Sequence, residues 1–166
     1  LMPPPSPPSP PSAPGSWSVA SAASWSTEGW VTSVDEGSRL TYTCGSWGTF
    51  MGGYKVFGKD AFAHKTYATP GQHTHLRITF TFLKIDRWDW EYAFLTVDGS
   101  HAWDRQFKSQ VGTRMCGVGG STPFSQEEAH AFFHDELHEV DVTVPHSSGN
   151  ATLRFFAELS DSDEFW

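Results

Sequence analysis

Three carboxylates stand close together in the stretch TFLKIDRWDWEYAFLTVD, residues 81–98. Asp86, Asp89 and Glu91 fall between two apolar, β-prone runs, where we expect one strand to end and the next to begin. Oxygen donors on such a turn suit Ca²⁺, which takes several oxygen ligands. Asp89 and Glu91 are two residues apart and should share one face of a strand, whereas Asp86 reaches them only through a turn.

The acidic end of the chain would add oxygen ligands if it folds back onto the same rim. The sequence therefore predicts a structural Ca²⁺ as the one cofactor, with these ligands: Asp86, Asp89, Glu91, Asp163 and Glu164. The alternative is a solvated acidic turn in which Asp side chains cap backbone amides.

The same acids are poorly arranged for catalysis. Glycosidases that resemble laminarinases carry E-x-D-x-x-E on one strand, whereas residues 86–91 read D-x-x-D-x-E, which does not place three acids on one face. The chain has no GxSxG elbow, and the glycine-rich CGVGGST lacks the lysine of a phosphate loop. We therefore expect no enzyme and no catalytic residue.

Two tryptophans flank the acids and suggest carbohydrate binding, since an exposed indole ring can stack on a sugar. Strand alternation would put Trp88 and Trp90 on one side, and Trp47 and Trp103 are further candidates. The alternative is that these rings pack in the core or at its rim.

The histidines give weaker signals. His130, His134 and His138 are spaced four apart, as zinc ligands on a helix would be, but His138 is expected to open a strand. His73 and His75 lie two apart at the start of another expected strand. Surface or hydrogen-bonded histidines are the favoured interpretation.

Two features favour secretion. Cys44 and Cys116 are too far apart for a CxxC motif, and we expect them to form one long-range disulfide, in keeping with secretion; the alternative is two buried thiols. The disulfide would stabilise the fold by roughly 4 kcal/mol. Asn150 begins an N-glycosylation sequon, Asn-Ala-Thr, in an expected turn. We expect a secreted, extracellular or cell-surface protein.

Composition narrows the partners. The chain has 166 residues, a formal net charge of −8 and no long basic run, which argues against nucleic acid and anionic membranes. No apolar run is long enough to span a membrane, so we expect no membrane insertion. The chain begins at Leu1 without a signal segment, and we expect that a leader has been removed or that the chain is part of a longer polypeptide.

Three segments are expected along the chain. Residues 1–14 are rich in Pro and Ser and should form a stiff polyproline II extension, residues 15–26 a linker or donor strand, and residues 27–166 a β-sandwich. Only Ser125–His138 could be helical. Expected strands are Gly29–Val34, Leu40–Tyr42, Tyr54–Gly58, Phe62–Tyr67, His75–Ile85, Glu91–Val97, His101–Phe107, His138–Val144 and Ala151–Leu159.

Period-two alternation supports an all-β fold. In HLRITFTFLKI the apolar residues Leu76, Ile78, Phe80 and Phe82 share one face and polar residues the other. HEVDVTV and ATLRFFAEL repeat this pattern. We therefore expect an antiparallel sandwich in which each sheet has one wet face.

The repeated SPP units resemble the hydroxyproline-rich glycoproteins of green algae and plants, pherophorin-type proteins included. The prolines of those families are hydroxylated and glycosylated. The resemblance implies the same modification at Pro4, Pro5, Pro7, Pro8, Pro10 and Pro11.

A second resemblance covers most of the remaining chain. GGYKVFGKD, the stretch from HTHLRITF to VDGSHAW, VTVPHSSGNATLRFFAEL and DSDEFW occur in this order. They resemble a jelly-roll module of secreted and surface proteins of algae and ciliates, and more distantly the MAM, galactose-binding-like and concanavalin-like sandwiches. The resemblance implies an antiparallel jelly-roll β-sandwich for adhesion or assembly, and related sandwiches often hold one structural calcium.

One departure from that module suggests how the protein could assemble. DSDEFW stops where such modules continue into a last strand, which would leave an unpaired sheet edge. The edge could accept residues 15–26 of a neighbouring copy, with Trp17, Val19 and Trp25 as contacts, giving a head-to-tail fibre or array. The alternatives are a last strand paired within the chain, and a carbohydrate-binding, lectin-like module on a stiff linker whose partners are glycans.

Overall fold

The computed structural model describes residues 26–34, 38–69, 71–117, 133–161 and 164–166. The expected polyproline II extension, the donor segment with Trp17, Val19 and Trp25, and the ligand candidate Asp163 lie outside these ranges. So do the proline glycosylation positions, which are Pro4, Pro5, Pro7, Pro8, Pro10 and Pro11.

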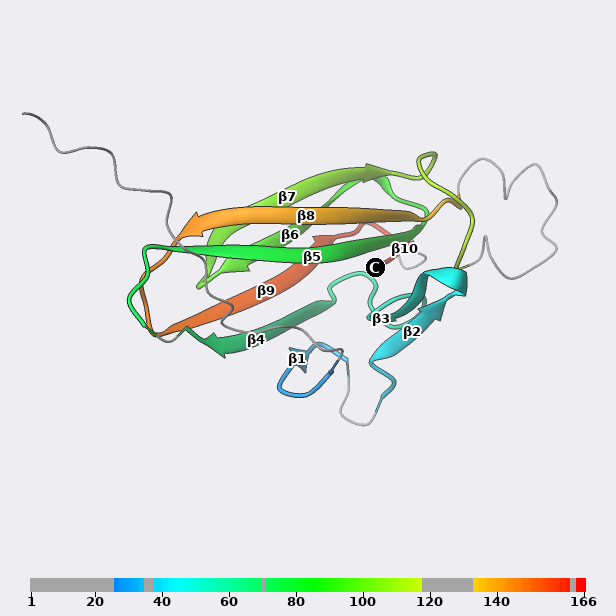
Figure 1. Ribbon diagram of the computed structural model, residues 1–166. Coiled ribbons are helices and arrows are strands. Elements are labelled where there is room, and N and C mark those ends of the chain that lie inside the picture. Colours follow the sequence, from blue (N-terminus) through cyan, green and yellow to red (C-terminus); the bar gives the residue numbers. More distant parts are fainter. Residues whose placement is uncertain (1–25, 35–37, 70, 118–132, 162–163) are drawn as a thin grey trace, which may run out of the picture.

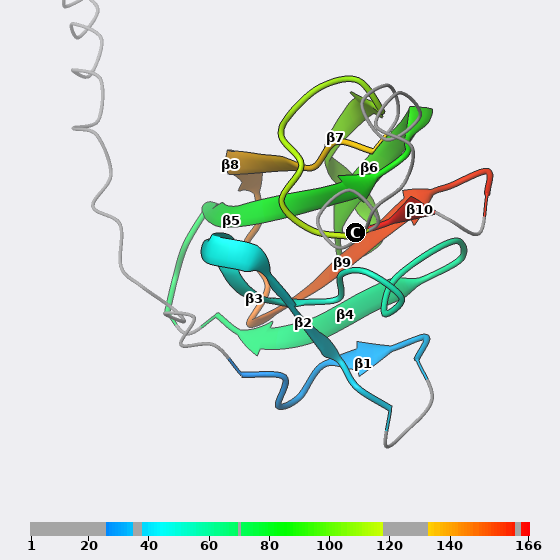
Figure 2. The same ribbon diagram turned by 90° about the vertical axis from the view of Figure 1, so that its right-hand side faces the viewer.

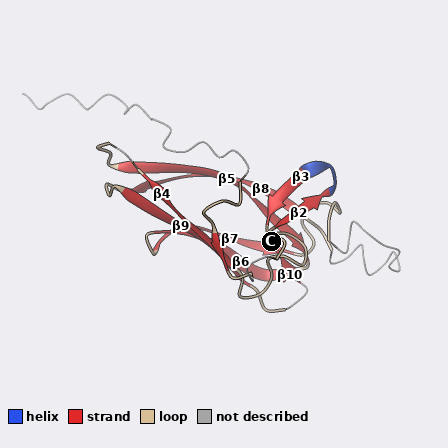
Figure 3. Cartoon of the chain, turned by 90° about the horizontal axis from the view of Figure 1, so that it is seen from below, coloured by secondary structure: helices blue, strands red, loops and turns tan. Residues whose placement is uncertain are grey.

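The described chain folds into antiparallel β-strands with one short 3₁₀ turn, η1 (Gly45–Trp47). Figure 3 shows this turn in blue beside the strands β2 and β3. The strands are β1 (Val31–Thr32), β2 (Thr41–Cys44), β3 (Gly48–Met51), β4 (Phe62–Ala68), β5 (His75–Asp86), β6 (Asp89–Val97), β7 (Ser100–Lys108), β8 (Glu136–Pro145), β9 (Asn150–Glu158) and β10 (Glu164–Phe165).

Two sheets form the layers of a sandwich (Figures 1 and 2). The larger sheet has the order β1-β4-β9-β6-β7 and the smaller has the order β10-β5-β8. The pairs β4–β9, β5–β8 and β6–β7 are nested within one another along the chain, which is the wrapping of a jelly roll. The predicted all-β, antiparallel sandwich is confirmed.

The core lies where the alternating faces of the two sheets meet. The expected inward face of β5 is confirmed, and Phe80 meets the rings of Trp103 and Phe155 with centroids 5.4 and 4.9 Å apart. Trp88 and Phe107 are fully or nearly fully buried and contact each other at 5.3 Å. Aromatic burial of this kind is a large part of the stability of such a sandwich.

A second core cluster covers the outer face of β5 near its C-terminal end. The β2–β3 ribbon lies over Leu83 and Ile85, and the disulfide between Cys44 and Cys116 closes this layer with a Cα–Cα distance of 4.9 Å. The second half of β5 is therefore buried on both faces, whereas its first half has an exposed face. The predicted disulfide is confirmed, and it is typical of an oxidising environment.

Asp135 holds the loop that carries Cys116. Its carboxylate accepts backbone N–H bonds from Met115 at 2.7 Å, Cys116 at 2.6 Å and Asp86 at 3.0 Å. Burial raises the pKa of Asp135, while these amides and the charge of Lys84 lower it. Satisfying a buried carboxylate with backbone donors is what makes its burial tolerable.

Some expected elements were wrong. The expected strand Tyr54–Gly58 is a turn, because Gly52, Gly53 and Lys55 have positive φ and the Val56 N–H bonds to the Gly53 carbonyl at 2.9 Å. Ser125–His138, the one stretch that could be helical, ends in a strand, since β8 begins at Glu136; residues 125–132 lie outside the described chain. The short strands β3 and β10 were not anticipated.

Candidate functional site

The structure separates the predicted calcium ligands. Asp86 is fully buried and its N–H bonds to Asp135, whereas Asp89 is exposed and lies 2.8 Å from Arg87 in a salt bridge. Glu91 is buried. The expectation that Asp89 and Glu91 share one face is therefore wrong.

A β-bulge explains this separation. Asp89 pairs with Lys108 and Tyr92 with Gln106, so Trp90 and Glu91 together oppose a single residue of β7. Trp90 takes a φ of 75°, which turns the chain and breaks the alternation. A bulge of this kind leaves no period-two signal in the sequence.

Glu91 and Glu164, by contrast, are brought together. The Ser160 hydroxyl donates to Glu91 Oε1 at 2.8 Å and lies 3.5 Å from Glu164 Oε1, while the Asp161 N–H donates to Glu164 Oε2 at 2.8 Å. Burial, with the neighbouring Glu91 charge as a further cause, raises the pKa of Glu164 to about 7. Glu164 therefore keeps its proton up to about pH 7.

One carboxyl oxygen of Glu91 and Glu164 lacks a hydrogen bond to the described residues. Glu91 Oε2 is buried and has no hydrogen-bond partner among the described residues. In the part of the chain that the structure describes, no group of three or more His, Cys, Asp or Glu side chains is placed to hold a metal ion. Calcium at this rim stays a prediction, and Asp163 lies outside the described residues.

The tryptophans do not lie as expected for a sugar platform. Trp88 is fully buried and its indole N–H donates to the Phe165 carbonyl at 3.1 Å, so it cannot stack on a ligand. Trp90 is 57% exposed, with Lys108 Nζ 3.9 Å from the centre of its ring. Trp47 and Trp103 are partly buried against the two core clusters. The prediction that Trp88 and Trp90 share one side is wrong.

An aromatic row on the outer face of the larger sheet was missed by the sequence reasoning. Phe156 on β9 pairs with Phe62 on β4 and with Phe94 on β6, and the Phe94 and Phe156 rings stack at 4.9 Å. Their neighbours Ala93 and Ala157 point into the core, so these rings point outward. The alternation of apolar and polar residues within each strand indicates that each ring points outward. It does not show that the three rings are neighbours, because that depends on how distant strands pair.

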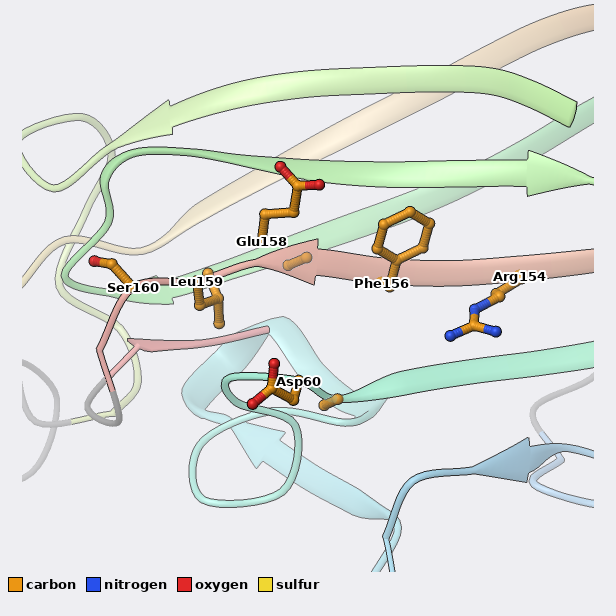
Figure 4. Close-up of a pocket in the computed structure, with 8 residues that line it drawn as sticks. Asp60, Arg154, Phe156, Glu158, Leu159 and Ser160 are labelled. Atoms are coloured by element: carbon orange, nitrogen blue, oxygen red, sulfur yellow. The ribbon is translucent and has the colours of Figure 1, made fainter. Parts of the chain in front are cut away.

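A shallow hollow of about 470 Å³ lies beside this row (Figure 4). Asp60, Arg154, Phe156 and Glu158 line it together with Ser160, which also bonds to Glu91. The Arg154 guanidinium lies 4.5 Å from the centre of the Phe62 ring, a cation–π contact. Charged side chains that can form hydrogen bonds thus lie beside aromatic rings. Such a surface suits a ligand that has polar groups on one side and apolar atoms on the other.

The smaller sheet has an open edge. β10 pairs with β5 only at Ile85 and Asp86, and between His75 and Lys84 no described strand pairs with that edge. An edge strand presents unpaired N–H and C=O groups to any added strand. The prediction of a last strand missing from the chain is corrected in part, because β10 begins to fill this edge.

The remaining candidate residues are spread over the molecule. His138 lies on β8 and His134 Nδ1 is 3.1 Å from the Ser109 carbonyl, so these two are not on one helical face; His130 lies outside the described residues. His73 contacts His146 rather than His75. Asn150 is exposed at the start of β9, where a glycan could be attached.

Comparison with known proteins adds no family assignment. No protein-family model matches the chain, and no curated protein matches it. In the described part of the chain, no helical segment has the length and apolarity needed to span a membrane. What the geometry defines is a class: a disulfide-bonded antiparallel β-sandwich with an open sheet edge and an aromatic outer face.

Proposed function

We propose that this protein is an extracellular structural module that assembles with copies of itself by strand addition. The observation that carries this proposal is the edge of β5, which is 12 residues long yet pairs on this side at two positions among the described strands. Long edges of this kind are normally protected by charges, prolines or bulges, or are used for pairing.

The sequence supplies a matching strand. In SWSVASAASW, Trp17, Val19 and Trp25 fall on one face when the segment is extended, and the opposite face carries only Ser and Ala. The β5 edge alternates in the same way, with Leu76 and Ile78 turned inward and Arg77 and Thr79 outward. A donor strand added to this edge would thus place its apolar side chains toward the core and its Ser and Ala side chains on the solvent-exposed face of the smaller sheet.

The direction of assembly follows from the symmetry of this contact. The donor segment and the β5 edge are different surfaces, so the contact is heterologous and grows into an open chain rather than a closed dimer. The disulfide and the sequon at Asn150 support an extracellular place for such an array.

The test measures mass against concentration by light scattering, with electron microscopy of the concentrated sample. The intact chain should form filaments, and Val19→Pro should abolish them because proline removes a backbone donor from the added strand. Val19→Ile is the matched control and should still assemble. An intact chain that stays monomeric at high concentration would contradict the proposal, and so would filaments that persist in Val19→Pro.

Carbohydrate binding is the second candidate, and the aromatic row with its hollow favours it. The Tyr92 ring is 37% exposed beside Phe94, at a centroid distance of 6.0 Å, and Arg154 and Glu158 supply hydrogen-bonding groups nearby. A glycan array should then give hits that Tyr92→Ala and Phe156→Ala abolish. Val111→Ala, which removes an exposed side chain outside this row, should leave them unchanged.

A further inference from the structure

No described strand covers the aromatic row on the outer face of the larger sheet. Strands β5, β8 and β10 lie on the other face of this sheet, and the β2–β3 ribbon lies over β5. The Tyr92, Phe94 and Phe156 rings follow one another at centroid distances of 6.0 and 4.9 Å. Phe62 is the cross-strand partner of Phe156 and extends the row onto β4. A contiguous apolar surface of this kind marks an interaction site.

Arg154 adds hydrogen-bond donors to this row. Its guanidinium lies 4.5 Å from the centre of the Phe62 ring and 5.8 Å from that of the Phe156 ring, and Figure 4 shows it beside Phe156 on β9. Its N–H groups make no hydrogen bond or ion pair to the residues that the structure describes. The nearby carboxylates of Asp60 and Glu158 disfavour an acidic ligand. The row therefore suits an uncharged, apolar ligand that offers hydrogen-bond acceptors.

Residues 3–14 have this chemistry. Their serines and prolines repeat every three residues, and a polyproline II helix has three residues per turn. In this conformation the serines form one edge of the rod and the prolines form the other two edges, which together make an apolar face. The edges are Ser6, Ser9 and Ser12; Pro4, Pro7 and Pro10; and Pro5, Pro8 and Pro11. The carbonyl groups of such a rod make no internal hydrogen bonds and are free to accept them.

We propose that residues 3–14 dock as a polyproline II rod on the aromatic row of the same chain. Proline-rich segments commonly bind aromatic-lined surfaces, because the rod is already ordered before it binds. The row crosses β6, β9 and β4 over about 15 Å, which corresponds to about five residues of the rod. This contact goes beyond the assembly proposed above and requires neither that assembly nor a glycan ligand.

The connecting segment is long enough for this contact. Residues 15–25 join the rod to the described chain, which begins at the β4 edge of the same sheet. Lys65 Nζ on β4 donates to the Glu28 carbonyl at 2.7 Å and fixes this starting point. From β4 the row extends over two strand spacings, which is about 10 Å. A linker of 11 residues has a root-mean-square end-to-end distance of about 18 Å, so the rod can reach the whole row.

Hydroxyl-radical footprinting of the full chain, read by mass spectrometry, tests the contact through oxidation of the Tyr92 and Phe156 rings. The chain is produced without proline modification, because a glycan on the prolines would cover the face that makes the contact. A short linker gives an effective concentration of about 1 mM, so a contact with a Kd of about 0.5 mM would slow oxidation of both rings about threefold. Pro7→Asp with Pro10→Asp breaks the apolar face and should abolish this protection.

The matched control places the same two charges on the opposite edge of the rod. Ser6→Asp with Ser9→Asp changes the net charge by the same amount but leaves the proline edges intact, so the protection should remain. All four positions precede the sandwich, so the fold should be the same in both double variants. Val111 is exposed outside the row and serves as an internal reference, whose oxidation rate should not change.

NMR of the unchanged chain gives a second readout that needs no variant, because docking predicts NOEs between proline ring protons and the Tyr92 or Phe156 ring. Equal oxidation rates in the unchanged chain and in Pro7→Asp with Pro10→Asp would overturn the proposal. Protection that is lost equally in both double variants would overturn it as well, since the face of the rod would then not matter. Protection that grows with protein concentration would also overturn it, because the rod would then bind a second copy.

Discussion

The buried carboxyl pair of Glu91 and Glu164 predicts that the protein loses stability as the pH rises through neutrality. Folding raises the pKa of Glu164 from 4.5 to about 7. A carboxyl group whose pKa is raised in the folded state contributes stability that is fully present below its unfolded pKa and is lost as the pH rises through the folded value. The window is therefore pH 4.5 to about 7.

Glu164→Gln removes this dependence. A shift from 4.5 to about 7, at about 1.4 kcal/mol for each pH unit, corresponds to about 3 kcal/mol. Glutamine stays neutral at every pH, and its amide can donate to the unpartnered Glu91 Oε2. The variant should thus be about 3 kcal/mol more stable than the unchanged chain above neutral pH, and about equally stable near pH 4.5.

Urea unfolding followed by tryptophan fluorescence measures both free energies of unfolding across this range, with a chelator present throughout so that no cation replaces the proton of Glu164. Glu158→Gln is the control, because Glu158 is an exposed carboxylate at the end of β9. Its curve should follow that of the unchanged chain. Parallel curves for Glu164→Gln and the unchanged chain from pH 4.5 to 8 would show that folding does not raise the pKa of Glu164.

The remaining predictions concern stability and the predicted ion. Replacing Cys116 by Ala, with its partner also replaced, should lower the free energy of unfolding by about 4 kcal/mol in denaturant titrations, because the disulfide closes a loop of 72 residues. Asp135→Asn should cost about 3 kcal/mol by the same assay, since an amide nitrogen would face backbone N–H groups. Trp88→Ala should cost about 4 kcal/mol and Trp90→Ala less than about 0.5, because one ring is in the core and the other is exposed. EDTA should lower the melting temperature if calcium is bound at the acidic rim, and an unchanged melting temperature would contradict that prediction.

The sheets could be predicted from the sequence wherever one face is wet. β5, β8 and β9 each alternate apolar and polar residues over most of their length, and their bounds were anticipated to within a few residues. The pattern failed at residues 54–58, because β-prone side chains there follow Gly52 and Gly53, whose positive φ turns the backbone. Local backbone conformation of this kind is not encoded in hydrophobic periodicity.

The candidate sites could be predicted less well, because each depends on contacts between distant segments. Glu91 and Glu164 were both proposed as ligands, but the bulge that turns Glu91 inward and Asp89 outward has no sequence signal. The pairing of His73 with His146 joins loops far apart in the chain. The residue types in the sequence indicate which side chains are candidates. Which of them lie close together depends on how the strands pair, and the sequence does not show this.

The disulfide also has a mechanical consequence. A force applied to the two ends of the chain bypasses the 72-residue loop between Cys44 and Cys116. This loop contains β3, β4, β5, β6 and β7. About 250 Å of extended polypeptide is thereby withheld from stretching. Under tension the molecule would lengthen only through the segments before Cys44 and after Cys116. Reduction of the disulfide would allow the loop between the two cysteines to extend as well.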